Sequence, residues 1–297
     1  MTARDEGFLL LTAYLGNPER KPLTIPQFRE LAKRVQAMEK PDVDRDLQKE
    51  DLLELGYSHA FADRIVELLS QTEELSWYLQ KGKHSGCAPI SRLDFAYPPR
   101  LRKHLKLDAP GVLWSKGDIC LLQEPAIALV GSRELLEENR KFAEEVGKQA
   151  ALQGFALVSG HARGADRVAQ NSCLSYGGKV ISVVSDRLDL YTEQENLLYL
   201  SETGFDLPFS AQRALQRNRV IHTLGTKTFV AQSGFKKGGT WDGTKNNLRF
   251  GWSPVFCFDD GSAACCELEQ MGATRIALHD LCSIEKLQSP IISFIDQ

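Results

Sequence analysis

The second half of the chain alternates short apolar runs with longer amphipathic segments. Continuous apolar runs such as 126–130 and 155–158 are typical of strands that are buried on both faces. Strands that alternate with helices predict an α/β fold, a doubly wound and mostly parallel sheet with right-handed crossovers. The expected strands are 126–130, 155–158, 179–184, 228–232, 254–258 and 274–278, and the expected helices are 134–153, 165–176, 192–203, 211–224, 244–250 and 262–271.

The N-terminal part has a different pattern, with apolar residues at helical spacing up to about residue 85. Segment 52–65 places a Leu-Gly turn between two helices, as in small helical modules of the sterile-α-motif or helix–hairpin–helix kind. Such a hairpin can offer backbone amides to a nucleic-acid phosphate. The same pattern suits a purely structural packing module, which is the interpretation favoured here. The expected helices are 8–15, 25–38, 47–55 and 60–69.

Between these two parts, segment 81–110 is rich in glycine and proline and is expected to be a linker. A short strand is expected over 111–118. The predicted organisation is therefore a helical domain over 1–85, a linker with a first strand over 86–125, and a doubly wound domain over 126–297.

Composition narrows the function classes. The 297 residues carry a net charge of −3, so any site for an anionic partner must be local. The longest apolar runs are too short to span a bilayer, and the N-terminus lacks the pattern of a signal peptide. The seven cysteines are scattered without disulfide or zinc-site spacing. We expect a cytoplasmic protein with no membrane partner, metal or cofactor.

Three glycine-rich turns follow expected strands, at 130–133, 159–166 and 238–240. Ligands of open parallel sheets bind at the carboxyl ends of the strands. Gly131 permits a close approach of the backbone, Ser132 is expected to cap the next helix, and Arg133 supplies a forked cation. The turns therefore predict a crevice for a phosphate-bearing partner. The alternative for each turn is an ordinary helix cap beside a solvated arginine.

Segment 205–251 contains eight cations and only two acidic residues. Such basic clusters are the electrostatic footprint of nucleic-acid binding, although a solvated helix face and a flexible basic loop would look alike. Aromatic residues accompany the cations, as in sites for single-stranded nucleic acid. Trp241, in a glycine-rich loop, is expected to be a stacking platform, whereas Phe205 and Phe209 are expected to be core residues.

Signals for catalysis are poor. Neither Gly-x-Ser-x-Gly nor His-Glu-x-x-His occurs, and the glycine spacing fails the Gly-x-Gly-x-x-Gly dinucleotide pattern. We therefore expect a binding protein rather than an enzyme.

Several motifs together resemble the DNA-processing protein A (Smf) family, within the wider Rossmann-like group that includes the cytokinin-activating phosphoribohydrolases. They are Tyr-Pro-Pro-Arg-Leu at 97–101, Ala-Leu-Val-Gly-Ser-Arg at 128–133, Ser-Gly-His-Ala-Arg-Gly-Ala-Asp at 159–166 and Arg-Asn-Arg-Val-Ile at 217–221. The chain departs from the family at Ala165, at Gln170, at 222–225 and at 237–243. Too few residues follow Ile276 for the winged-helix domain found in some relatives.

The resemblance implies a Rossmann-like fold and a protein that binds single-stranded DNA, forms a homodimer and hands the strand to a RecA-type recombinase. The phosphate-binding residues expected from motifs and resemblance together are Gly131, Ser132, Arg133, Ser159, Gly160, Arg163, Gly164, Arg217, Asn218, Arg219, Lys237, Gly238, Gly239, Thr240, Trp241 and Lys245. All six cations of this set are expected to line one crevice.

A nucleotide-binding sensor or a phosphoribohydrolase-like enzyme, which could serve a defence system, is the alternative. Those hydrolases carry Gly-Gly-x-Gly-Thr followed two residues later by a catalytic Glu. Segment 239–243 offers only Asp242 at the corresponding place, which argues against the enzyme.

Overall fold

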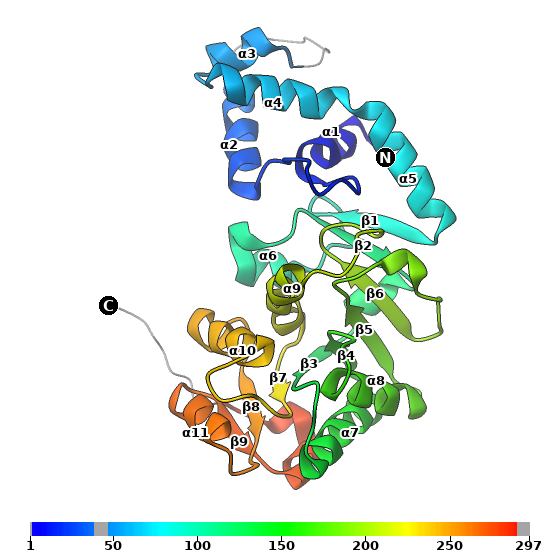
Figure 1. Ribbon diagram of the computed structural model, residues 1–297, viewed down its shortest axis with the longest axis vertical. Coiled ribbons are helices and arrows are strands. Elements are labelled where there is room, and N and C mark those ends of the chain that lie inside the picture. The colour runs from blue at the N-terminus through cyan, green and yellow to red at the C-terminus, as the bar shows by residue number, and fades with distance from the viewer. Residues whose placement is uncertain (1, 39–46, 290–297) are drawn as a thin grey trace.

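The computed structural model describes residues 2–38 and 47–289, and nine strands form one sheet across these residues (Figure 1). The strands are β1 (Cys87–Ser91), β2 (Val112–Lys116), β3 (Ala126–Val130), β4 (Ala156–Ser159), β5 (Lys179–Val183), β6 (Leu197–Ser201), β7 (Thr228–Val230), β8 (Val255–Phe258) and β9 (Thr274–Ile276). Pairing is parallel from β6 through to β9 in the order β1-β2-β6-β5-β4-β3-β7-β8-β9, and antiparallel at β1–β2 and β2–β6. The predicted doubly wound α/β fold is confirmed.

The strand order reverses at β3. The chain moves outward from β3 through β4 and β5 to β6, then returns to place β7 on the other side of β3. The connections that leave β3 and β7 therefore run to opposite sides, which opens a crevice at their carboxyl ends. This switch point is where the fold itself directs a ligand.

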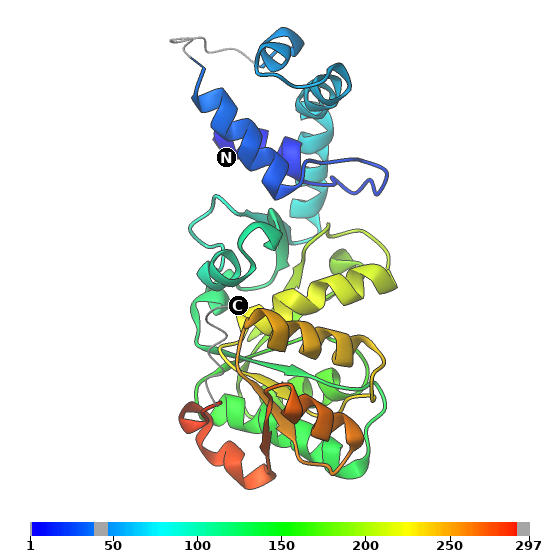
Figure 2. The same ribbon diagram turned by 90° about the vertical axis from the view of Figure 1, so that its left-hand side faces the viewer.

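Helices cover both faces of the sheet (Figure 2). Ile127 and Leu129 of β3 face the core that contains α7 and α8, whereas Ala128 and Val130 face the core that contains α6, α9, α10 and α11. Successive strand residues point to opposite faces, so a strand covered on both sides must be apolar throughout. These helices are α6 (Pro99–Leu105), α7 (Glu137–Leu152), α8 (Ala165–Ser175), α9 (Ala211–Leu224), α10 (Gly239–Phe250) and α11 (Ala263–Gln270).

The N-terminal helices gather at one end of the long axis (Figure 1). They enclose a small apolar core of their own, built on Leu31, Leu52 and Ile65. In the Leu-Gly hairpin, the carbonyl of Leu55 accepts a hydrogen bond of 2.8 Å from Arg34, a contact that favours the packing interpretation. These helices are α1 (Ala3–Thr12), α2 (Ile25–Gln36), α3 (Lys49–Glu54), α4 (His59–Ser70) and α5 (Thr72–His84).

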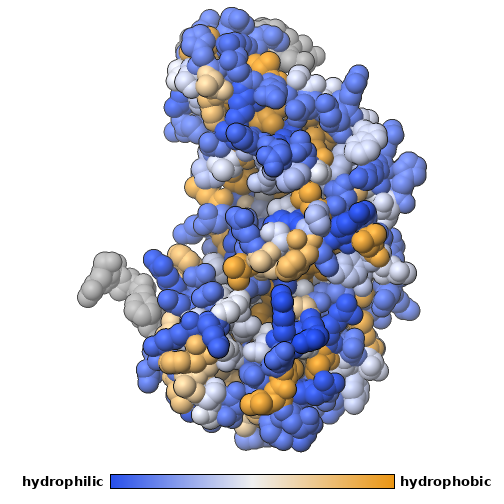
Figure 3. Space-filling model, in the orientation of Figure 1, coloured by the Kyte–Doolittle hydropathy of each residue, from blue (hydrophilic) through white to orange (hydrophobic). Residues whose placement is uncertain are grey.

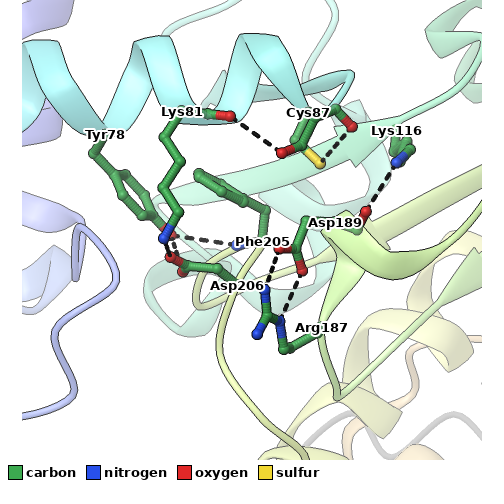
Figure 4. Close-up of polar contacts among 9 residues, drawn as sticks. Tyr78, Lys81, Cys87, Lys116, Arg187, Asp189, Phe205 and Asp206 are labelled. Carbon is green, nitrogen blue, oxygen red and sulfur yellow. Dashed lines mark hydrogen bonds and ion pairs between the residues drawn. The ribbon is translucent and has the colours of Figure 1, made fainter.

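Helix α5, which the sequence analysis does not predict, joins this module to the sheet (Figure 4). The carboxylate of Asp206 accepts hydrogen bonds from the hydroxyl of Tyr78 at 2.8 Å and the ammonium of Lys81 at 2.7 Å. The ring of Tyr78 stacks on Phe205 with centroids 4.4 Å apart and meets Trp114 of β2 edge-on. Because all three rings are buried, α5 is fixed to the edge of the sheet by both apolar and polar contacts.

Two predicted segments are wrong. The supposed linker 81–110 contains β1 and α6, and β1 pairs with β2 along its whole length. Segment 192–203, expected to be a helix, contains β6. An apolar run as short as 197–200 has no periodicity that separates a buried strand from a buried helix. The ends of the predicted domains at residue 1 and at 290–297 lie outside the described residues.

Candidate nucleic-acid interface

A cleft of about 590 Å³ opens at the switch point. Its walls come from the β3–α7 and β7–α10 turns, the start of α8, and one side of α9. Exposed Arg133 and Lys237 lie at the cleft, and neither makes a hydrogen bond or ion pair with a residue that the structure describes. The cleft therefore offers two exposed cations that no carboxylate of the described residues pairs.

Ser132 fixes the shape of the β3–α7 turn. Its backbone N–H donates to the carbonyl of Gln232 at 3.0 Å, and its hydroxyl donates to the same oxygen at 3.3 Å. Its own carbonyl accepts from the N–H of Ala165 at 3.1 Å. The expectation that Ser132 caps the next helix is wrong, because α7 starts at Glu137 with Leu136 as its N-cap. Ser132 instead ties β3 to β7 and α8.

The β4–α8 turn is closed by the carboxylate of Asp166, which accepts hydrogen bonds from the backbone N–H groups of Gly160 at 3.1 Å and Ala162 at 3.2 Å. Gly164 has φ +90°, and a side chain there would collide with the backbone of the β3–α7 turn. Asp166 thus already uses two amides of this turn, those of Gly160 and Ala162. His161 also serves the fold, since its ring packs edge-on against Tyr191.

Arg217 of α9 lies beneath this turn and is only 7% exposed. Its Nη1 donates to the carbonyl of Val183 at 2.8 Å, and its guanidinium occupies the space where a side chain at Gly160 would lie. Burial lowers the pKa of Arg217 and raises the pKa of Asp166, and the opposite charge of each partner counteracts both shifts. The Nε of Arg217, which has no hydrogen-bond partner among the described residues, is the one unsatisfied polar atom of this group.

The β7–α10 turn presents a helix N-terminus to the cleft. Gly238, with φ +90°, is the N-cap of α10, and it has no side chain that could cap the first turn. The first amides of a helix have no acceptor within the helix and carry partial positive charge. With Lys237 directly before them, these amides form a site suited to an anion. Asn218 of α9 steadies the turn by donating to the carbonyl of Gly239 at 3.0 Å.

Of the predicted residues, nine line this cleft. They are Gly131, Ser132, Arg133, Arg217, Asn218, Lys237, Gly238, Gly239 and Thr240. Arg163 and Gly164 line a neighbouring groove between α7 and α8. Ser159 is fully buried and accepts a hydrogen bond from Gln170, and Gly160 lies over Arg217. Lys245 is exposed on α10 outside the residues that line the cleft.

The sequence model of the DNA recombination-mediator protein A family matches residues 89–285. The chain belongs to this family. DNA processing protein DprA of Streptococcus pneumoniae R6 is 33% identical over 166 residues, which are 50% of this chain and 55% of that protein. Protein Smf of Escherichia coli K12 is 29% identical over 154 residues, 48% and 40% of the two chains. The chain thus spans about half the length of these relatives.

Solved structures show the same fold. The structure of S. pneumoniae DNA processing protein A superposes with a TM-score of 0.68 at 27% identity, covering 87% of this chain and 93% of that one. DNA processing protein A of Helicobacter pylori, described for its single-stranded DNA binding mode, gives a TM-score of 0.55 at 21% identity over 66% and 94%. Among the described residues, no helix has the length and apolar character needed to cross a membrane.

The expectation that six cations of this family member line one crevice is wrong. Arg219 is bound by Glu202 at 2.8 Å, with both side chains largely buried, and it lines a groove on the other side of α9. Arg163 and Lys245 also lie off the cleft, so three of the six cations reach it.

The aromatic expectations are also corrected. Trp241 is 4% exposed and belongs to the core beneath α9 and α10. It looked like a loop residue because glycines precede it, but those glycines start α10. Phe205 is buried as expected, whereas Phe209 is 55% exposed and lines the cleft. The sequence signal for Phe209 was its place after Pro208, just ahead of the basic helix.

One family departure accounts for a buried polar cluster behind the cleft. His222 is fully buried and accepts a hydrogen bond at Nδ1 from the amide of Asn247 at 3.1 Å. Burial lowers the pKa of His222 to about 3. Gly243 makes room for the ring, since a Cβ there would lie 3.1 Å from its Nε2. A neutral histidine therefore packs between α9 and α10.

Proposed function

We propose that this protein binds single-stranded DNA in the switch-point cleft and acts in DNA processing or recombination without catalysis of its own. The observation that carries the proposal is a pair of exposed cations, Arg133 and Lys237, that no described residue pairs, beside the uncapped N-terminus of α10. Cations and helix amides bind phosphates without reading sequence. Phe209 adds an exposed ring on which a base can stack.

Family membership supports the wider role. The family is named for recombination mediation, and the H. pylori relative is described as binding single-stranded DNA. We propose that this chain protects single-stranded DNA, acts as a homodimer, and passes the strand to a RecA-type recombinase.

A second candidate is a nucleotide sensor, because a cleft of about 590 Å³ lies within the size range of small-ligand pockets. A phosphoribohydrolase is disfavoured by position. Asp242, which stands where those enzymes carry the catalytic Glu, lines the groove on the far side of α9 rather than the cleft.

The test is fluorescence anisotropy with labelled oligothymidine across a salt series. The logarithm of the binding constant should fall with the logarithm of the salt concentration, with a slope of roughly −0.7 per neutralised phosphate. Arg133→Ala should weaken binding and make this slope shallower by roughly 0.7, the value for one phosphate contact. Arg249→Ala, at the exposed far end of α10, is the matched control and should leave both unchanged. Absence of binding at low salt, together with binding of a mononucleotide, would replace the proposal with the sensor.

A further inference from the structure

Two grooves adjoin the switch-point cleft. The first, here called the α7–α8 groove, has a volume of about 970 Å³ and shares Arg133 with the cleft. The second, here called the α9 groove, has a volume of about 1310 Å³ and shares Leu215 and Asn218 with it. It runs between the helical module and the sheet, where Figure 3 shows the surface hollowed and its walls mixed in polarity. Either groove could receive a strand that leaves the cleft.

A strand must leave the cleft, because the cleft has the size of a small-molecule pocket. Modules that hold single strands without sequence preference contact about 4–16 nucleotides. The remaining nucleotides therefore lie on the surface outside, and the charge of that surface decides their path.

The two grooves differ in charge. The α7–α8 groove is lined by five cations, among them Arg140, Lys148 and Arg167, against three carboxylates. The α9 groove has as many carboxylates as it has lysines and arginines. Burial and neighbouring cations also lower the pKa of His104 in the α9 groove, so this residue stays neutral at pH 7. Only the α7–α8 groove carries a surplus of positive charge.

Each acidic residue of the α7–α8 groove pairs with one of the groove's cations. Within α7, Glu144 pairs with Arg140 at 3.2 Å and Glu145 pairs with Lys148 at 3.1 Å. Glu134 pairs with Arg163 at 3.3 Å, but the two side chains are 89% and 79% exposed. Exposed ion pairs, and pairs one turn apart on a helix such as Glu145 and Lys148, contribute little, so a phosphate can take the place of the carboxylate. Further along, the ring of Tyr176 is half exposed and lies 5.9 Å from the ammonium of Lys148, which combines a stacking face with a cation.

We propose that single-stranded DNA leaves the switch-point cleft past Arg133 and continues along the α7–α8 groove, where Arg167 and Lys148 bind its phosphates. The proposal rests on the proposed function and specifies its path. Arg133 belongs to both surfaces and so marks the point where the strand passes from one to the other.

The experiment compares labelled oligothymidines of about 4 and about 16 nucleotides, the two ends of the common range of site sizes. Arg167→Ala/Lys148→Ala should bind the short strand like wild type and the long strand more weakly. Its salt slope on the long strand should shrink by about 1.4, for two phosphates at roughly 0.7 each. The matched control, Lys103→Ala/Lys106→Ala, removes two exposed cations from the α9 groove and should change neither strand.

The outcomes separate the two proposals. If wild type binds neither strand, the proposed function fails. If wild type binds both but Arg167→Ala/Lys148→Ala behaves like wild type on the long strand, the path proposed here is wrong. A loss confined to Lys103→Ala/Lys106→Ala would assign the strand to the α9 groove. Unchanged urea midpoints establish that each variant is folded.

Discussion

The turn 130–133 and the segment 205–251 differ in how many of their cations remain available to a ligand. The turn has one cation, Arg133, and the fold leaves it free at the cleft. The segment has eight cations, and five of them bind other residues of the protein. Burial and pairing, not the number of basic residues, decide how much positive charge reaches a ligand.

The engaged cations of the segment bind several different elements, which is why the sequence alone does not reveal their roles. Lys237, Lys245 and Arg249 remain exposed, and only Lys237 of these three lies at the cleft. The engaged cations are Arg213 with Thr203, Arg217 with Val183, Arg219 with Glu202, Lys227 with Ile284 and Glu285, and Lys236 with Glu267.

The largest effect expected concerns the most deeply buried of these cations. Arg217→Met should lower the free energy of unfolding by about 3 kcal/mol, because it removes the stronger of the two cations that act on the buried carboxylate of Asp166 and leaves the carbonyl of Val183 without its donor. Urea denaturation measures the change. Arg133→Ala, which removes an exposed cation, should stay within about 0.5 kcal/mol of wild type.

A second variant tests the cause. Arg217→Met/Asp166→Asn removes both charges while an amide oxygen can still accept from Gly160 and Ala162. This double variant should be more stable than Arg217→Met alone. A loss of less than about 1 kcal/mol for Arg217→Met would contradict the structural role and return Arg217 to the ligand-binding set.

The next largest effect concerns a residue of segment 205–251 that is buried and neutral, His222, and it is a pH dependence of stability. An unfolded histidine has a pKa of about 6.5, whereas His222 in the fold has a pKa of about 3. Below about pH 6.5 the unfolded chain therefore binds a proton that the folded chain does not. As the pH is lowered from about 6.5 to about 3, the free energy of unfolding decreases by about 1.4 kcal/mol per pH unit.

Urea unfolding of wild type and His222→Asn at a series of pH values checks this. Between about pH 3 and pH 6.5, the free energy of unfolding of the variant should depend on pH less steeply than that of wild type, by about 1.4 kcal/mol per pH unit. This difference in slope does not depend on the stability of the variant at neutral pH. Asp166, whose pKa is raised by burial, is present in both chains and cancels in the difference. Parallel curves for the two chains would show that His222 is not the group that titrates.

The smallest effect compares two lysines of the same segment. Lys237→Ala should reduce the salt slope of oligothymidine binding by roughly 0.7, one phosphate contact, whereas Lys245→Ala should leave it unchanged. Both side chains are exposed, so neither change should alter stability. Equal effects of the two substitutions would mean that the ligand covers the outer face of α10 as well as the cleft.

The sequence predicts the elements of the doubly wound sheet well where strands are flanked by glycine-rich turns, as at β3, β4 and β7. It fails at β6, where a short apolar run has no distinguishing period, and at β1, where proline and glycine suggest a linker. Pairing with β2 is a long-range contact that overrides the local signal at β1.

For the site, the sequence locates the three turns but not the use of their polar groups. Asp166 closes the turn by accepting hydrogen bonds from the amides of Gly160 and Ala162. The sequence does not reveal this role, because the distance between the carboxylate and these amides depends on the fold of the turn. Trp241 and Phe209 exchange their expected roles for a similar reason. The direction in which an aromatic residue points depends on where a helix starts, and boundaries are the least certain part of a prediction.

Asp206 gives the molecule a mechanical property. Its carboxylate is pinned to α5 by Tyr78 and Lys81, and the exposed ring of Phe209 lies only three residues further along the chain. Three residues reach no more than about 11 Å, so this tether has little slack. The helical module and the rim of the cleft are therefore connected through one short segment, 206–209.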